Sequence, residues 1–218
     1  MKVSVIVTCY NRERFIGRAI RSALTQKFDN NQYEVIVVDD GSTDNSREII
    51  SDFGDKIIAI FHRENKGLPT ARNTGIRKAM GRFVVHLDSD DYVHDELLNI
   101  EYMHLAMNSH WGAVECDYIE VDENNRHVRR CDATEKPIAC GIMFRKDRLV
   151  DIGLYDERML CCEDEELRSR FEQKYTVGHI CLPLYRYTRH QSSLTHDQAS
   201  MEYYRSKIKD AEKEDEPS

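Results

Sequence analysis

Acidic side chains follow directly on a short apolar segment in the middle of the chain. Residues 84–87 are mostly apolar, and Asp88, Ser89, Asp90 and Asp91 come next. Such a segment is typical of a buried strand, and in an open α/β sheet ligands bind where the carboxyl ends of the strands meet solvent. Neighbouring carboxylates repel one another, so we expect a cation or several hydrogen-bond donors to hold them. Asp88 and Asp90 are spaced to reach one Mg²⁺ or Mn²⁺, although a polar strand end with a helix cap explains the same residues.

A second pair of acids, Asp39 and Asp40, also stands at the end of a predicted strand. Their carboxylates would point to the same edge of the sheet as Asp88 and Asp90, where they could accept from a base N–H or a ribose hydroxyl. A turn followed by a helix cap also explains these residues, because Ser42 is a good capping residue. The short motif alone favours that structural interpretation.

Three further groups carry side chains suited to binding or catalysis. Gly67 permits a close backbone approach, and Arg72, near the start of a predicted helix, can stack on a base or pair with phosphate. The acidic run from Glu163 to Glu166 would place a general base at the amino end of a helix, or would form a solvated helix start. His190 could be a further metal ligand or contact a diphosphate, whereas a lone histidine more often does neither.

The composition excludes several classes of protein. The 218 residues carry a formal net charge of −8, which argues against a general affinity for nucleic acid or anionic lipid. The seven cysteines show no paired zinc spacing and no secretory framework, so we expect free thiols in a reducing cytoplasm. No stretch approaches the length of about 20 apolar residues that a spanning helix requires. We therefore expect a cytoplasmic protein, or one peripheral to the inner face of the membrane.

Hydrophobic spacing divides the chain into strands and helices. Residues 3–8, 33–38, 57–62 and 82–87 are predicted strands, and 14–24, 45–53, 70–80 and 95–108 are predicted helices. Repeated βα units predict a parallel sheet. In the second half we predict a hairpin of 113–121 and 126–130, strands at 138–144 and 177–187, the latter interrupted by Pro183, and helices at 147–152 and 163–174. The expected fold class is α/β, a mostly parallel mixed sheet flanked by helices in one domain.

In order along the chain, these stretches resemble the inverting family 2 glycosyltransferases of the GT-A fold. The matching sequences are VSVIVTCYN from Val3, DDGSTD from Asp39, NKGLPTARN from Asn65, LDSDD from Leu87, CGIMFR from Cys140, GLYDE from Gly153, ED from Glu163 and YTRH from Tyr187. Each motif is weak alone, but their ordered combination is specific. The resemblance implies a Rossmann-like GT-A domain at residues 1–199, with a nucleotide-sugar-binding half at 1–92 and an acceptor half at 93–199, followed by a polar helix or tail at 200–218.

The resemblance also implies roles for individual residues. The nucleotide sugar would contact Thr8, Tyr10, Asn11, Asp39, Asp40, Arg72, Asp88 and Ser89. The divalent metal, Mn²⁺ or Mg²⁺, would be held by Asp90 and His190, and the acceptor by Glu163 and Gly141. Asp164 would be the general base that deprotonates an acceptor hydroxyl, so that the configuration inverts in one displacement.

The expected activity is therefore the transfer of one sugar from a nucleotide-diphosphate sugar to a hydroxyl acceptor. UDP is the commonest donor nucleotide of the family, and the acceptor would be a glycan, a lipid-linked molecule or another hydroxyl compound. The Gln/Arg-X-X-Arg-Trp element of processive synthases is missing, so we expect a non-processive enzyme. Little sequence follows His190, so the acceptor site should be small, or completed by another subunit or a missing domain. A homodimer or a membrane-associated partner is the expected form of such a subunit.

Two alternatives remain open at this point. A non-catalytic module that binds sugar nucleotides could keep the same fold, although the intact Asp90 and Asp164 argue against it. A sugar nucleotidyltransferase shares the architecture, but that class has a glycine- and lysine-rich amino-terminal loop, and residues 3–14 contain no glycine.

Overall fold

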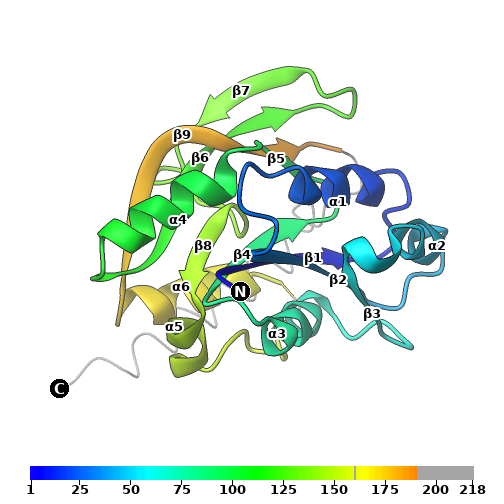
Figure 1. Ribbon diagram of the computed structural model, residues 1–218, viewed down its shortest axis with the longest axis horizontal. Helices are drawn as coiled ribbons and strands as arrows, with labels where there is room; N and C mark the ends of the chain where they lie inside the picture. The colour runs from blue at the N-terminus through cyan, green and yellow to red at the C-terminus, as the bar shows by residue number, and fades with distance from the viewer. Residues whose placement is uncertain (160, 191–218) are drawn as a thin grey trace.

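The computed structural model describes residues 1–159 and 161–190, and over these it shows one sheet covered by helices on both faces (Figure 1). Within the described residues the sheet has nine strands, in the order β3-β2-β1-β4-β8-β6-β9-β5 with β7 paired to β6. The first four strands are parallel: β1 (Val3–Cys9), β2 (Tyr33–Asp39), β3 (Ile58–Phe61) and β4 (Phe83–Asp88). The apolar, β-branched sequences of β1, β2 and β4 suit strands buried on both sides, whereas β3 at the edge of the sheet is partly exposed. The predicted parallel α/β core is confirmed.

The second half of the sheet is mixed. The strands β6 (Trp111–Val121) and β8 (Ile142–Arg145) are antiparallel to each other, and β8 is also antiparallel to β4. The hairpin of β6 and β7 (His127–Cys131) is present as predicted. By contrast, β9 (Thr176–Thr188) pairs in parallel with β6, and β5 (Tyr92–Val93) pairs antiparallel with β9.

Two predicted strand boundaries were wrong. The strand expected at 138–144 begins only at Ile142. The last strand continues through Pro183. A register shift between β6 and β9 falls beside this residue, and proline, which has no N–H to donate, is tolerated at such irregular positions.

The helices form one layer on each face of the sheet (Figure 1). The helices α1 (Ile16–Leu24), α2 (Ser46–Ser51) and α4 (Leu97–Met107) pack on one side, together with a short 3-10 helix at Gly54–Lys56. The helices α3 (Leu68–Lys78), α5 (Lys146–Asp151) and α6 (Glu163–Glu172) pack on the other. Alternate residues of each strand face opposite layers, so Val5 and Val7 join the first core and Ile6 the second.

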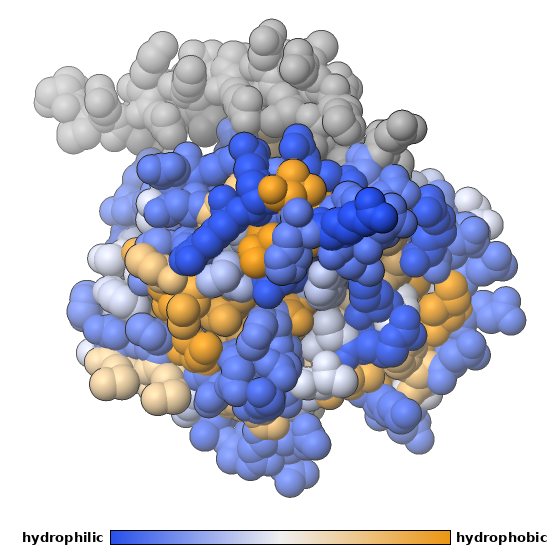
Figure 2. Space-filling view, turned by 90° about the horizontal axis from the view of Figure 1, so that it is seen from above, coloured by the Kyte–Doolittle hydropathy of each residue, from blue (hydrophilic) through white to orange (hydrophobic). Residues whose placement is uncertain are grey.

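The outer surface is mainly hydrophilic, with smaller hydrophobic areas between the polar side chains when seen from above (Figure 2). Among the described residues, every helix is too short or too polar to cross a membrane. The polar helix or tail predicted at 200–218 lies outside the described residues.

One acid lies inside the core, away from the edge of the sheet. Glu101 of α4 is fully buried, and within the described residues neither of its carboxyl oxygens has a hydrogen-bond partner. Burial raises the pKa of this carboxyl well above its usual value. Glu101 is therefore protonated in the folded chain at a pH where it is ionised in the unfolded chain.

Replacing this carboxyl should change how stability depends on pH. Above the unfolded pKa of about 4.3, the wild-type free energy of unfolding should fall by about 1.4 kcal/mol per pH unit until the raised folded pKa is reached. Glu101→Gln has no ionisable carboxyl at this position and so avoids this loss. The free energy of unfolding of the variant should therefore increase relative to that of the wild type as the pH rises. Urea denaturation at several pH values measures both curves, and parallel curves would contradict the expectation.

Candidate active site

A large cavity opens at the carboxyl ends of the parallel strands. Its volume is about 1730 Å³, more than the roughly 300–1000 Å³ of a pocket for one small ligand, so it has room for two substrates. The loops after β1 and β4, the start of α6 and the end of β9 all contribute to its wall. The predicted site residues that line it are Thr8, Tyr10, Asn11, Asp40, Arg72, Asp88, Ser89, Asp90, Glu163, Asp164 and His190.

Arg72 joins the two halves of this cavity. Its guanidinium is buried and donates to Glu163 Oε1 at 2.7 Å and to Asp88 Oδ1 at 3.1 Å. It also lies over the ring of Tyr155, with 5.3 Å from Cζ to the ring centroid. Arg72 is therefore neither a solvent-exposed arginine nor free to lie flat on a base, and it ties the end of β4 to the start of α6.

Asp40 shapes the loop that follows β3. Its carboxylate accepts from the backbone N–H of Lys66 and Gly67, at 3.0 and 2.8 Å, and lies 2.6 Å from His62 Nδ1. Gly41 has a φ of +75°, and a Cβ on it would lie 2.4 Å from the carbonyl carbon of Glu64. Only glycine fits this close approach, so the turn after β2 and the loop before α3 hold Asp40 at the cavity.

Two predicted contacts do not reach the cavity. Asp39, the last residue of β2, is fully buried, accepts from the Ser42 N–H at 3.3 Å and pairs with Arg47 at 3.3 Å. Gly141 adopts a φ of +71° and lies against Tyr185, where a Cβ would be 3.0 Å from the ring. Among the described residues that line the cavity neither appears. Both residues have packing partners of their own, and the expected donor contact of Asp39 and acceptor contact of Gly141 stay predictions.

The acids after β4 have separate surroundings. Asp90 Oδ2 lies 2.8 Å from His190 Nε2 and accepts from Arg12 Nε at 3.1 Å. Burial raises the pKa of Asp90, but the hydrogen bond to His190 and the charge of Arg12 outweigh it, so the pKa is lowered. Asp90 and His190 thus present an oxygen and an imidazole nitrogen at the separation of two adjacent ligands of one octahedral cation, about 3 Å. These two donors fit a Mn²⁺ site.

Asp91 is a structural acid. It is buried and accepts from Tyr185 Oη and from the Thr188 N–H, both at 2.7 Å. Burial raises the pKa of Asp91 well above its usual value, and the nearby Asp88 and Asp90 raise it further. Asp91 therefore fastens the loop after β4 to β9.

The first turn of α6 carries the candidate base. The helix begins at Glu163, after Cys162 in a left-handed conformation with a φ of 59°. Burial raises the pKa values of both Glu163 and Asp164, while the charge of Arg72 lowers them. Asp164 lines the cavity and is only partly buried, so its carboxylate can be reached by a substrate hydroxyl.

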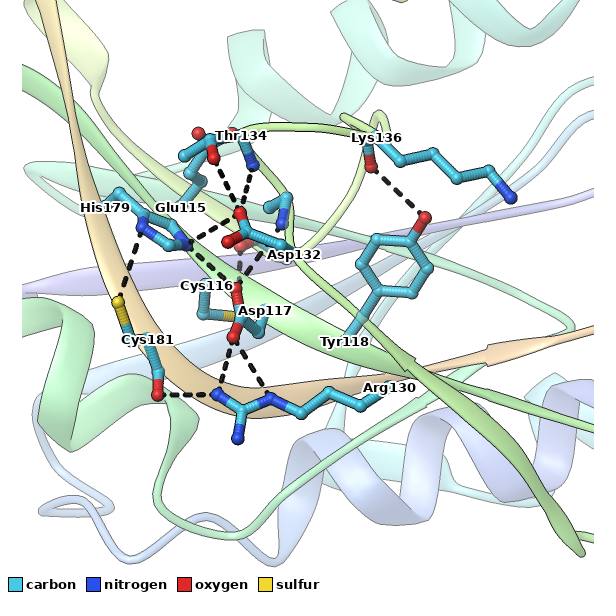
Figure 3. A network of polar contacts seen from close by, with 12 residues as sticks. Glu115, Cys116, Asp117, Tyr118, Arg130, Asp132, Thr134, Lys136, His179 and Cys181 are labelled. Carbon is cyan, nitrogen blue, oxygen red and sulfur yellow. Dashed lines mark hydrogen bonds and ion pairs between the residues drawn. The ribbon is translucent and has the colours of Figure 1, made fainter.

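A second group with metal-ligand geometry lies on β6, β9 and the segment after β7 (Figure 3). The ligand atoms of Asp117, Asp132 and His179 lie within 4.8 Å of one another. His179 Nε2 is 2.8 Å from Asp117 Oδ1, while Asp117 Oδ2 accepts from Arg130 at 2.6 Å. Arg130 pairs with Asp117 as Arg12 pairs with Asp90, so the two groups differ in their place: Asp90 and His190 line the large cavity, whereas Asp117, Asp132 and His179 are not among its lining residues.

Sequence reasoning missed several residues of the site. Arg12 and His62 contact Asp90 and Asp40, but they come from other loops, and no local pattern marks them. The tight turn at Gly41 was the available signal for the placement of Asp40, since an acid followed by glycine after a strand predicts a fixed turn.

Comparison with known proteins gives a consistent set of similarities. The sequence pattern of glycosyl transferase family 2 matches residues 4–157. An uncharacterized glycosyltransferase of Rickettsia felis is 36% identical over 128 residues, which is 58% of this chain and 21% of that protein. Poly(ribitol-phosphate) beta-N-acetylglucosaminyltransferase TarS of Staphylococcus aureus is 38% identical over 101 residues, or 45% of this chain and 18% of TarS.

Solved structures share the fold. The crystal structure of S. aureus TarS 1–349 in complex with UDP superposes with a TM-score of 0.75 at 25% identity, covering 87% of this chain and 61% of that one. The mannosyltransferase PcManGT of Pyrobaculum calidifontis, in complex with GDP-Man and Mn²⁺, gives a TM-score of 0.79 at 18% identity, covering 100% of this chain and 65% of that one. Both superpositions confirm the GT-A architecture.

Removing the buried guanidinium should destabilise the chain strongly. Arg72→Met leaves Glu163 and Asp88 without their shared cation, and we expect a loss of about 3–5 kcal/mol in the free energy of unfolding. Arg77→Met on the same helix is the control, because Arg77 and its partner Glu157 are exposed; it should cost less than about 1 kcal/mol. Urea denaturation compares the two, and equal losses would show that the Arg72 bridge is not needed for stability.

Proposed function

The chain belongs to glycosyl transferase family 2, and from that premise we propose that it moves one sugar from a nucleotide-diphosphate sugar to an acceptor hydroxyl with inversion. The observation that carries this proposal is a single cavity lined by Asp88, Asp90 and Asp164 and joined across its middle by Arg72. A donor held by the acids after β4 and an acceptor beside α6 would then meet in one space.

The donor would lie over the ends of β1 and β4. Thr8, Tyr10, Asn11, Asp40 and Ser89 line this part of the cavity. UDP is the proposed donor nucleotide, and it is the nucleotide bound in the TarS structure. The proposed ribose contact is Asp88, whose Oδ1 is held by Arg72 and whose side chain stays 30% exposed.

Asp90 and His190 would hold a divalent metal, Mn²⁺ or Mg²⁺, as their facing oxygen and nitrogen allow. Bound there, the metal would supply positive charge to a leaving diphosphate. PcManGT, which shares the fold, was solved with Mn²⁺. Arg12, which donates to the same Asp90 oxygen, keeps the carboxylate ionised and oriented.

Asp164 is the proposed general base. Its ionised carboxylate would accept the proton of the attacking acceptor hydroxyl, which then displaces the nucleotide from the opposite face of the sugar. The raised pKa makes the carboxylate a stronger base than an exposed aspartate. Glu163, held by Arg72, fixes the start of α6 and so orients Asp164.

The chain spans about a fifth of the length of the first curated relatives that it matches. The acceptor of the whole protein is therefore part of the proposal: a glycan, lipid-linked or other hydroxyl compound, modified by single sugars and without processive synthesis. A cytoplasmic location, or one on the inner face of the membrane, agrees with this substrate class.

Donor turnover tests the proposal directly. The purified chain with Mn²⁺ should release nucleotide from one member of a panel of UDP-, GDP-, dTDP- and CDP-sugars, and chelation should stop the release. Asp164→Asn should reduce turnover by about 10²- to 10⁴-fold, and Asp90→Ala should abolish the response to Mn²⁺. Asp147→Asn, at an exposed helix start, is the matched control. Full activity in Asp164→Asn would overturn the assignment of the base.

The pH dependence gives a second test of Asp164. Because the base works ionised and its pKa is raised, kcat/KM should fall with decreasing pH at a higher pH than the value of about 3.9 for an exposed aspartate. The charge of Glu165 contributes to that shift, so Glu165→Gln should move the acidic limb to lower pH, whereas Glu172→Gln on the same helix should not. If the acidic limb of the kcat/KM profile stays unchanged in both variants, the role of Asp164 is contradicted.

A further inference from the structure

Three cations surround one buried carboxylate at the acceptor side of the cavity. Glu120 of β6 has a side chain that is only 2% exposed. Arg129 donates to both of its oxygens, at 2.7 and 2.9 Å, while Lys136 lies at 2.9 Å and Arg189 at 3.2 Å. Hydrogen bonds from Arg129 and Lys136 outweigh the effect of burial and lower the pKa of Glu120 to about 2. The carboxylate is therefore ionised and neutralises one of three positive charges.

The surplus charge faces open space. The side chains of Arg129, Lys136 and Arg189 are 51%, 55% and 57% exposed, so each keeps donors that Glu120 does not use. Glu135 lines the same cavity, and even when its charge is counted the group stays positive. Such a surplus is unusual in a chain with a net charge of −8, and it predicts an anionic ligand.

Three of the four residues of the cluster line the same cavity as the candidate catalytic residues, and Arg129 adjoins them through Glu120. Glu120, Lys136 and Arg189 line it together with Asp90 and Asp164. Arg189 immediately precedes His190, which contacts Asp90, and its backbone N–H donates to Val121 O at 2.8 Å. An anion held by the cluster would thus lie near the place where sugar transfer would occur.

The cluster is held in place before any ligand binds. Tyr118 Oη donates to Lys136 O at 3.1 Å, and Arg130 ties β7 to Asp117, as Figure 3 shows. Neighbouring residues of a strand point to opposite sides, so Arg130 anchors β7 from one side while Arg129 reaches Glu120 from the other. Preorganised cations bind an anion with a smaller loss of side-chain entropy.

We propose that Arg129, Lys136 and Arg189 bind a phosphate group on the acceptor, an inference that rests on the proposed function of the chain as a glycosyltransferase. Two guanidinium groups and an ammonium suit a phosphate ester, because guanidinium groups bind phosphate oxygens in pairs. The carboxylate of Glu120 holds the three cations together against their mutual repulsion. The acceptor would therefore be a phosphorylated hydroxyl compound, such as a polyol phosphate or a phosphorylated lipid.

Direct binding tests this site without any need for turnover. The full chain, with Mn²⁺ and UDP present, is titrated with glycerol 3-phosphate and with glycerol, and binding is followed by nuclear magnetic resonance. We expect glycerol 3-phosphate to bind at least about tenfold more tightly than glycerol, and Lys136→Gln and Arg129→Gln each to weaken it by about tenfold. Arg126→Gln, an exposed arginine near the same hairpin, should bind like the wild type. Equal binding by all four proteins would overturn the proposal.

Turnover separates this inference from the proposed function. If no donor is turned over but the phosphate still binds, the transferase proposal fails and the anion site stands. If turnover occurs, Lys136→Gln should raise the KM for a phosphorylated acceptor and leave the KM for the donor unchanged. A raised donor KM would instead assign the cluster to the donor diphosphate and overturn the inference. A glycerol phosphate oligomer and a short-chain 1-acyl-glycerol 3-phosphate, which both carry a phosphate and a free hydroxyl, are compared as acceptors and distinguish the two sources of phosphate.

Discussion

The buried guanidinium of Arg72 is the interaction on which the site depends. It contacts Asp88, at the end of a parallel strand, and Glu163, at the start of a helix from the other half of the chain. The cation offsets the repulsion between the two carboxylates, and its charge lowers the pKa of Glu163, which burial raises. The arginine is in turn too costly to bury without two anions. Arg72 needs both carboxylates, and each carboxylate needs Arg72. The three side chains therefore hold the end of β4 and the start of α6 at a fixed distance from each other.

The mixed sheet explains how the two halves come together. The four parallel strands end at one edge and deliver Asp40 and Asp88 there. The antiparallel strand β8 lies between β4 and β6, so the second half continues the same sheet instead of forming a separate one. Because β9 then runs parallel to β6, its carboxyl end returns to the cavity and brings Arg189 and His190 beside the acids.

Sequence periodicity was enough to predict the parallel core, since apolar strands and amphipathic helices alternate there. It could not decide between Asp39 and Asp40, because consecutive residues at a strand end face opposite sides and the choice depends on packing against Arg47. The left-handed φ of Gly141 and its close approach to the ring of Tyr185 also could not be read from the sequence, because Tyr185 is distant along the chain. The burial of Arg72 was also invisible, since its partners lie 16 and 91 positions away. Ion pairs of such long range have no local sequence pattern.

The residues at the end of β9 contact two different groups in the cavity, the cations around Glu120 and the acids after β4. Asp91 accepts from Tyr185 and from the backbone of Thr188, so the loop after β4 is joined to the last residues of β9. Directly after this anchor, Arg189 reaches Glu120 and His190 reaches Asp90. One short segment therefore supplies a cation to the proposed phosphate site and an imidazole to the proposed metal site. A shift of β9 by one residue would turn both side chains away from these partners, so the parallel register of β6 and β9 fixes the places of Arg189 and His190.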